Sequence, residues 1–144
     1  MQTFYKIGEI ANLTKLSPRT IDYYTKLGLI QSAARADNNY RLYTDETLTR
    51  LERIERLKKE KYTLDEIKQL FEQWYKTNID DQIAAKLSDL HIQLKHLEQI
   101  ANELRPIMEQ MKRKKAKNLY QALTIQAFAC MEALSVFVDN DLML

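Results

Sequence analysis

The fold is decided by residues 6–30, which read KIGEIANLTKLSPRTIDYYTKLGLI. Apolar residues recur at helical spacing near the start of this stretch and predict a first short helix. These residues are Ile7, Ile10 and Leu13. After a break, Ser17 supplies an N-cap and Pro18 the first helical position, so a second short helix is predicted to follow. Two short helices joined by a tight turn form a helix-turn-helix.

The second helix, which we expect to run to about Leu27, has two faces of different character. Ile21, Tyr24 and Leu27 share one face, where they can pack in the core against Ile7, Ile10 and Leu13 of the first helix. Gly28 supplies a left-handed stop. The opposite face carries four side chains, namely Arg19, Asp22, Tyr23 and Lys26. A helix fits the major groove of DNA and presents such side chains to the base edges. The stretch therefore predicts a DNA-binding helix.

A wing and two more helices are predicted to complete the DNA-binding domain. Over residues 31–43 the helical period disappears, and the segment RADNNYRLY places two Asn residues, which tolerate positive φ, between short β-compatible segments. We interpret it as a β-hairpin. Thr44 then caps a third helix with the core residues Leu48, Leu51, Ile54 and Leu57. A capping-box pattern at Thr63 predicts a fourth helix that turns inward Ile67, Leu70, Phe71 and Trp74.

Residues 1–75 are thus interpreted as a winged helix-turn-helix, and a heptad pattern follows them. Apolar residues alternate at spacings of four and three from Ile83 to Met111. A stripe this narrow is typical of a coiled coil, and a long helix lying on its own domain is the alternative. We predict residues 76–117 as a dimerisation helix that Pro106 kinks near its end. Its contacts would be Leu87, Leu90, Leu94, Leu97, Leu104 and Met108.

Residues 118–144 are predicted to contain a short C-terminal helix that is apolar on most sides and must be buried against something. If an effector pocket exists, it would be lined there by Tyr120, Phe128, Met131 and Phe137. This lining favours an apolar organic effector, while plain helix packing is the simpler interpretation. The preceding basic run, Lys112 to Lys117, is interpreted as a solvated helix terminus that the helix dipole favours.

Composition narrows the class of protein. The chain is 45% hydrophobic and 29% charged and has two Gly and two Pro, which favours a helical globular protein. A net charge of +2 is too small to indicate nucleic acid by itself, although residues 15–61 hold eleven Lys and Arg against seven Asp and Glu. The single cysteine, Cys130, can form no internal disulfide, which favours a reducing compartment. With no signal peptide or membrane-spanning stretch recognised, we expect a cytoplasmic protein that contacts no membrane.

Several side chains suit contacts with DNA. Arg19, near the start of the second helix, can donate two hydrogen bonds to a guanine or one to a phosphate. Tyr23 and Lys26 suit phosphate contacts, and the wing pair Tyr40-Arg41 can reach the backbone beside the groove. Tyr24 is expected in the core, and Tyr43 either packs in the wing or contacts DNA. Asp22 is an awkward neighbour for phosphate unless it accepts a hydrogen bond from a cytosine amino group or pairs with a nearby basic group.

Three stretches resemble the successive signatures of the MerR family of transcriptional regulators. They are KIGEIANLTKLSPRTIDYYTKLGLI, NNYRLYTDETLTRLERIERLK and YTLDEIKQLF. The resemblance implies a head whose third and fourth helices form a second wing, and a homodimer joined by an antiparallel coiled coil. It also implies binding to a palindromic operator in a promoter, distortion of that operator in response to an effector, and RNA polymerase as a partner. Some members only repress.

The resemblance also assigns DNA contacts to Arg19, Tyr23, Tyr40 and Arg41, and brings residues 58–62 near the backbone of DNA. The complete predicted set is Ser17, Arg19, Thr20, Tyr23, Lys26, Tyr40, Arg41 and Lys61. The chain departs from the family at three places. DYYT at residues 22–25 replaces the common Arg-Tyr-Tyr-Glu, and Asn39 and Lys61 stand where Gly is frequent. The change to Asn39 is tolerable if the backbone there is left-handed.

Other functions have weaker support from the sequence. Metal-sensing relatives use several cysteines, which Cys130 alone does not match, and His91 and His96 do not face one another on a helix. A metal site shared across a dimer stays an alternative, and we otherwise expect no metal and no cofactor. A DNA-binding repressor or architectural protein without an effector is a second alternative, and a coiled-coil module that binds protein is a third. No catalytic constellation is recognised, so we do not expect an enzyme.

Overall fold

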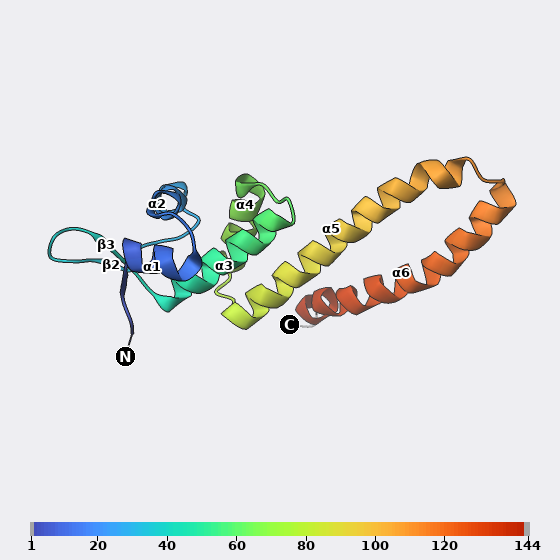
Figure 1. The fold of residues 1–144 in the computed structure, drawn as a ribbon. Coiled ribbons are helices and arrows are strands. Elements are labelled where there is room, and N and C mark those ends of the chain that lie inside the picture. The colour runs from blue at the N-terminus through green and yellow to red at the C-terminus, as the bar shows by residue number, and fades with distance from the viewer. Residues whose placement is uncertain (1, 143–144) are drawn as a thin grey trace. The chain divides into compact units, whose positions relative to one another are not determined.

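A computed structural model describes residues 2–142 of the chain, with side chains through residue 135. The described residues are mainly helical and include a small sheet (Figure 1), as the sequence predicts. The chain divides between Lys95 and His96 into two compact units. The elements are β1 (Tyr5–Lys6), α1 (Ile7–Thr14), α2 (Pro18–Leu27), β2 (Ala34–Arg35), β3 (Arg41–Tyr43), α3 (Asp45–Lys59), α4 (Leu64–Lys76), α5 (Asp81–Glu109) and α6 (Arg113–Leu142).

The helices α1 and α2 form the predicted helix-turn-helix. Ser17 caps α2 because its Oγ accepts a hydrogen bond from the backbone N–H of Thr20 at 3.1 Å. Pro18 occupies the first helical position. Gly28 ends the helix with a φ of 81°, and its N–H donates to the carbonyl of Thr25 at 3.1 Å. The predicted limits of α2 are therefore confirmed.

One core position of α1 differs from the prediction. Ile10 is completely buried and Ile7 partly so, but Leu13 is 60% exposed. Successive residues of a helix are rotated by about 100°, which carries Leu13 away from the stripe formed by Ile7, Ile10 and Ala11. Ala11, at 4% exposure, fills the place beside Ile10 instead. The prediction that Leu13 packs in the core is wrong.

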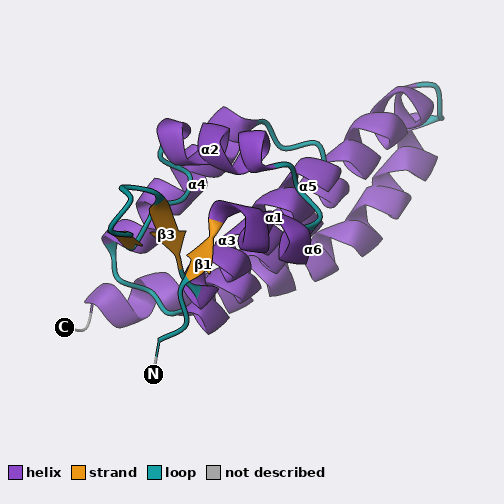
Figure 2. Cartoon of the chain, turned by 60° about the vertical axis from the view of Figure 1, so that its left-hand side comes forward, coloured by secondary structure: helices purple, strands orange, loops and turns teal. Residues whose placement is uncertain are grey.

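The wing belongs to a three-stranded antiparallel sheet of order β1–β3–β2 (Figure 2). The predicted hairpin consists of β2 and β3, in which Arg35 lies opposite Arg41. The sequence did not predict β1, which pairs with the other edge of β3 and places Tyr5 opposite Tyr43. Tyr43 is completely buried. The sheet therefore anchors the base of the wing in the core and leaves its tip free.

The helices α3 and α4 supply most of the remaining core. Thr63 caps α4, since its Oγ1 accepts a hydrogen bond from the backbone N–H of Glu66 at 3.1 Å, which confirms the predicted helix start. Leu48 and Leu70 are partly buried. The other predicted inward residues are buried, namely Leu51, Ile54, Leu57, Ile67, Phe71 and Trp74.

The first half of α5 packs on this core. Its Ala84, Ser88 and Ile92 are buried. The imidazole of His91 lies against the indole of Trp74, with ring centroids 5.7 Å apart, and burial lowers the pKa of His91. This part of α5 is therefore continuous with the DNA-binding head predicted to end at residue 75.

A buried arginine joins α3 to both α4 and α5. The side chain of Arg53 is 6% exposed, and its Nη1 donates a hydrogen bond to the hydroxyl of Tyr75 at 2.5 Å. Its Nη2 donates to the carbonyl of Asp81, the first residue of α5, at 3.3 Å. The guanidinium of Arg50 stacks on the ring of Tyr75, 3.8 Å from the ring centroid. These contacts determine where α5 leaves the head.

The bounds of the last two helices differ from those predicted. α5 continues past Pro106 to Glu109, and α6 begins at Arg113, so α6 is longer than the short helix expected. The end of α5 follows Pro106 within one turn, and Pro106 itself removes one hydrogen bond to the preceding turn of the helix. The basic run that begins at Lys112 therefore opens α6. Its interpretation as a helix end favoured by the dipole is wrong, since the N-terminus of a helix disfavours cations.

The heptad seam of α5 is largely open to solvent in the single chain. Leu94 is 44% exposed and Leu97 is 62% exposed, and Leu90 and Leu104 are exposed as well. Leu87 is partly buried against the core of the head, and Met108 is also partly buried. An apolar stripe of this kind marks an interaction surface.

Replacing Arg53 with Ala should destabilise the protein by about 2–4 kcal/mol, because the change removes a buried side chain and two partly buried hydrogen bonds from a charged donor. The free energy of unfolding from urea denaturation measures the effect. Arg56→Ala is the matched control on the same helix, since Arg56 is 55% exposed and pairs with Asp89 of α5 at 2.5 Å. It should cost less than about 1 kcal/mol. Equal losses for the two variants would contradict the assigned role of Arg53.

Candidate nucleic-acid interface

One face of α2 is open to solvent while the opposite face is part of the core. Ile21 and Tyr24 are 0% and 1% exposed, whereas Tyr23 is 52% exposed. The exposed face presents the side chains predicted from the sequence, namely Arg19, Asp22, Tyr23 and Lys26. We call these four residues the reading face. They lie at positions i, i+3, i+4 and i+7 of the helix, so they form one continuous strip.

Ser17 and Thr20, two of the predicted DNA contacts, are engaged with one another at the start of α2. Their hydroxyls are 2.8 Å apart and share a hydrogen bond, and Ser17 also accepts the N–H of Thr20. Their first role is therefore to cap the helix. This cap places the exposed side chain of Arg19 beside the N-terminus of α2.

The tip of the wing is a tight turn between β2 and β3. The backbone N–H of Ala36 donates to the carbonyl of Tyr40 at 2.8 Å, and Arg35 donates to the carbonyl of Asn39 at 2.8 Å. Asn39, which stands where Gly is frequent in the family, has a φ of 69°. Its backbone is therefore left-handed, a conformation that Asn tolerates. Tyr40 is 66% exposed. The wing therefore presents an aromatic ring and a hydroxyl to solvent.

An ion-pair network joins the wing to the reading face. The carboxylate of Asp22 accepts one hydrogen bond from Arg41 of β3 through Oδ1. Its Oδ2 lies 2.9 Å from the ammonium of Lys26, one turn further along α2. The hydrogen bond from Lys26, together with that from Arg41, lowers the pKa of Asp22. The carboxylate is thus ionised at neutral pH, and two predicted DNA contacts share it.

Two tyrosines support this surface from beneath. The hydroxyl of Tyr24 donates to Glu55 of α3 at 2.9 Å and accepts a hydrogen bond from Lys58 at 2.9 Å. Burial raises the pKa of Tyr24. The hydroxyl of Tyr43 lies 2.9 Å from Oγ1 of Thr25. Tyr24 is a core residue, as predicted, and Tyr43 is one as well, so neither belongs to the reading face.

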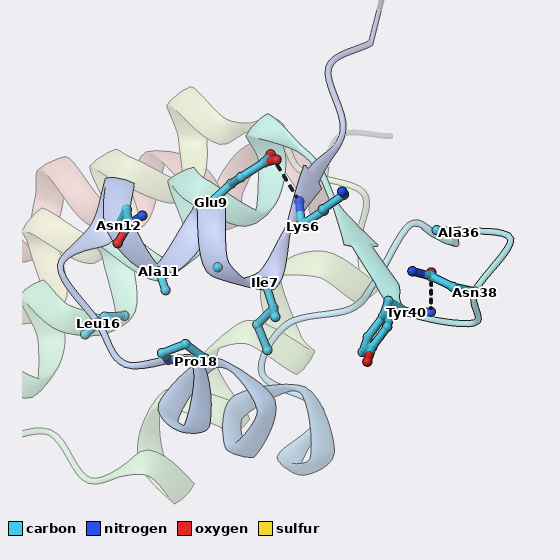
Figure 3. A pocket seen from close by; sticks show the side chains of 11 residues that line it. Lys6, Ile7, Glu9, Ala11, Asn12, Leu16, Pro18, Ala36, Asn38 and Tyr40 are labelled. Atoms are coloured by element: carbon cyan, nitrogen blue, oxygen red, sulfur yellow. Dashed lines mark hydrogen bonds between the residues drawn. The ribbon is translucent and has the colours of Figure 1, made fainter.

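A pocket of about 630 Å³ separates the wing tip from the helix-turn-helix. Figure 3 shows Asn38 and Tyr40 on the wing side, with Ile7, Asn12 and Pro18 on the helical side. No periodicity or motif in the sequence indicated this pocket, because it forms between elements that only the fold brings together.

Lys61 lies in the turn between α3 and α4. It is exposed and has a φ of 68°, so this replacement of a frequent Gly is also left-handed. Its carbonyl accepts a hydrogen bond from the ammonium of Lys95 at 3.4 Å. Lys95 also lies 3.9 Å from the centroid of the Tyr62 ring and 3.6 Å from the carboxylate of Glu66. The turn is thereby tied to α5.

Three of the four predicted effector residues lie along one side of α6. Tyr120, Phe128 and Met131 are exposed and line a shallow groove of about 190 Å³. The side chain of Phe137 lies outside the described residues. Cys130 is exposed, and among the described residues no group of three His, Cys, Asp or Glu could hold a metal ion. None of the described helices has the length and apolar character needed to cross a membrane.

Comparisons with known proteins bear on the chain as a whole. The model of a family described as MerR HTH family regulatory protein matches residues 5–74. The HTH-type transcriptional regulator CueR of Bacillus subtilis is 30% identical over 137 residues, covering 94% of this chain and 92% of that protein. The mercuric resistance operon regulatory protein of Bacillus cereus is 34% identical over 60% of this chain, which spans 61% of that protein.

Solved structures give a similar result. HiNmlR, a MerR family regulator lacking the sensor domain and bound to promoter DNA, superposes with a TM-score of 0.53 and 27% identity. That match covers 74% of this chain and 80% of HiNmlR. The HTH-type transcriptional regulator SkgA from Caulobacter crescentus shares the fold, with a TM-score of 0.54 and 20% identity over 87% of this chain and 99% of that one.

Proposed function

The chain belongs to the MerR family of helix-turn-helix transcriptional regulators, and we propose that it binds a palindromic promoter operator as a homodimer. The observation that carries this proposal is the contrast between the two faces of α2. Ile21 and Tyr24 hold one face in the core, which leaves Arg19 and Tyr23 exposed on the other. A relative with this fold is bound to promoter DNA.

Within this proposal the contacts divide into two kinds. Arg19 reads a base edge in the major groove, because two guanidinium donors match the two acceptors of guanine. Tyr23, Lys26, Tyr40, Arg41 and Lys61 contact phosphates or sugars and position the head without reading the sequence. Ser17 and Thr20 start the helix and lie close enough to its N-terminus to contact a phosphate as well.

The open seam of α5 supports a homodimer. A second copy would cover Leu90, Leu94 and Leu97, whose exposure is otherwise costly in water. Two heads related by a twofold axis then require a palindromic operator. In this assignment the head binds DNA, α5 dimerises and α6 carries the effector region.

We further propose that the dimer acts on transcription by changing the geometry of the promoter for RNA polymerase. An effector would do so by binding one of two DNA-bound arrangements more tightly than the other. The apolar groove along α6 supports an apolar organic effector. As a regulator rather than an enzyme, the protein would work in the cytoplasm, where it meets promoter DNA.

Two alternative functions predict different results in DNA-binding and transcription assays. A constitutive repressor or architectural protein would bind the operator but give transcription that no ligand changes. A coiled-coil module that binds protein would show no salt-dependent affinity for DNA of a selected sequence. Operator selection followed by transcription assays separates all three.

Arg19→Ala and Arg41→Ala should weaken DNA binding in different ways. The probe is a duplex selected from a random library by the wild-type protein, compared with a scrambled duplex of equal length. Arg19→Ala should cost about 1–3 kcal/mol on the selected duplex and relax the preference at one symmetric pair of positions. Arg41→Ala should weaken binding to both duplexes and flatten the salt dependence of binding, because a phosphate contact is lost. Unchanged affinity of both variants would show that the assigned DNA surface is wrong.

Leu94→Asp should convert the dimer into monomers or unfolded protein, because the seam cannot bury a carboxylate. Sedimentation equilibrium at micromolar concentration measures the mass. Gln93→Asp is the control, since Gln93 is exposed beside the seam on the same helix, and it should leave the dimer intact. A wild-type chain that sediments as a well-folded monomer would rule out the homodimer.

Phe128→Ala should alter the response to apolar ligands more than it alters affinity for DNA, because Phe128 lines the groove of α6. A reporter gene under the selected operator, exposed to a panel of apolar compounds, measures the response. Ile125→Ala is the control, as Ile125 is 75% exposed on α6 and outside the groove. Cys130→Ser should leave induction intact. Loss of induction in Cys130→Ser with normal operator binding would instead indicate thiol or metal chemistry.

A further inference from the structure

Asp22 is an acidic residue on a surface that otherwise offers cations and hydroxyls to DNA. A lone carboxylate there would repel phosphates and weaken binding to every sequence. In this chain it is not alone, because Arg41 donates to its Oδ1 and Lys26 lies 2.9 Å from its Oδ2. The three side chains together carry a net positive charge, so the cost of the carboxylate to DNA binding is offset.

The same contacts fix the direction of the carboxylate. One cation comes from the helix itself and the other from β3, so the carboxylate is held from two elements at once. Its side chain stays 35% exposed, between Arg19 and Lys26 on the reading face. Each carboxylate oxygen has a second lone pair that these ion pairs leave free. The side chain is therefore oriented and neutralised, and it can still accept a hydrogen bond.

A hydrogen-bond acceptor on the reading face discriminates among bases. The amino group of cytosine is the major-groove donor that aspartate usually accepts. The amino group of adenine lies beside the N7 acceptor, which repels a carboxylate, as do guanine N7 and O6 and thymine O4. We propose that Asp22 is a specificity-determining residue that accepts a hydrogen bond from a cytosine amino group. This inference rests on the proposed function, because it requires the reading face to lie in the major groove. Lys26 and Arg41 act on this contact as positioning residues, in addition to their contacts with the DNA backbone.

Selection from a random library of duplex DNA tests the inference. The wild-type protein should enrich cytosine at one pair of symmetric positions, and Asp22→Ala should lose that preference. Because Asp22→Ala also releases two cations, its affinity for a scrambled duplex should rise and its salt dependence should steepen by about one unit of slope. The ratio of affinities for the selected and scrambled duplexes should fall about tenfold.

A second substitution gives an independent result. Asp22→Asn keeps the size of the side chain and adds amide donors, which suit the N7 acceptor and N6 donor of adenine. It should move the preferred base at the same positions from cytosine to adenine. Glu72→Ala is the control for the change in net charge, since Glu72 is exposed on α4, and it should leave the base preference unchanged.

The outcomes separate this inference from the proposed function. Wild-type protein that enriches no sequence from the library contradicts the proposed function, and the role of Asp22 with it. If the wild type enriches an operator and both Asp22 variants keep its base preference and its affinity ratio, the inference is overturned and the proposed function stands.

Discussion

The burial of Tyr24 is the constraint on which the DNA-binding surface depends. Its ring lies in the core of the head, and its hydroxyl is held by Glu55 and Lys58 of α3. A tyrosine held at both ends fixes the rotation of α2 about its own axis. Because side chains of a helix keep a constant angular spacing, this rotation also determines that Arg19, Asp22 and Tyr23 face outward. The reading face is thus a consequence of packing on the opposite side of the same ten-residue helix.

A second set of contacts extends this rigidity to the proposed dimer seam. Arg53 joins α3 and α4 to the first residue of α5, and Lys95 joins α5 to the turn at Lys61. The compact unit that contains the reading face extends through Lys95, and so includes Leu90 and Leu94 of the seam. The angle at which a partner packs on these leucines therefore determines where its reading face points. An effector that changes this packing would change the positions of the two reading faces on the DNA, and this is the physical basis of the proposed regulation.

Much of this architecture could be predicted from the sequence, since local signals report local structure. Ser17, Pro18 and Gly28 mark the limits of α2, and the heptad spacing marks α5. Contacts between distant elements left no such signal. β1 has two residues and no pattern of its own, and the pairing of Asp22 with Arg41 depends on how the wing folds back on α2. Leu13 is exposed although its spacing predicts a core position, because a spacing of three residues fits two neighbouring stripes of a helix equally well.

In the proposed dimer, two copies of this head are joined by α5 and place two α2 helices in the major groove of one operator. Hydroxyl-radical footprinting of the wild-type protein on its selected duplex tests this most directly. Two joined heads should give a twofold-symmetric pattern of protection, with two equivalent half-sites separated by one helical turn of DNA or a multiple of it. A single asymmetric footprint on a duplex that the protein binds with full affinity would contradict it.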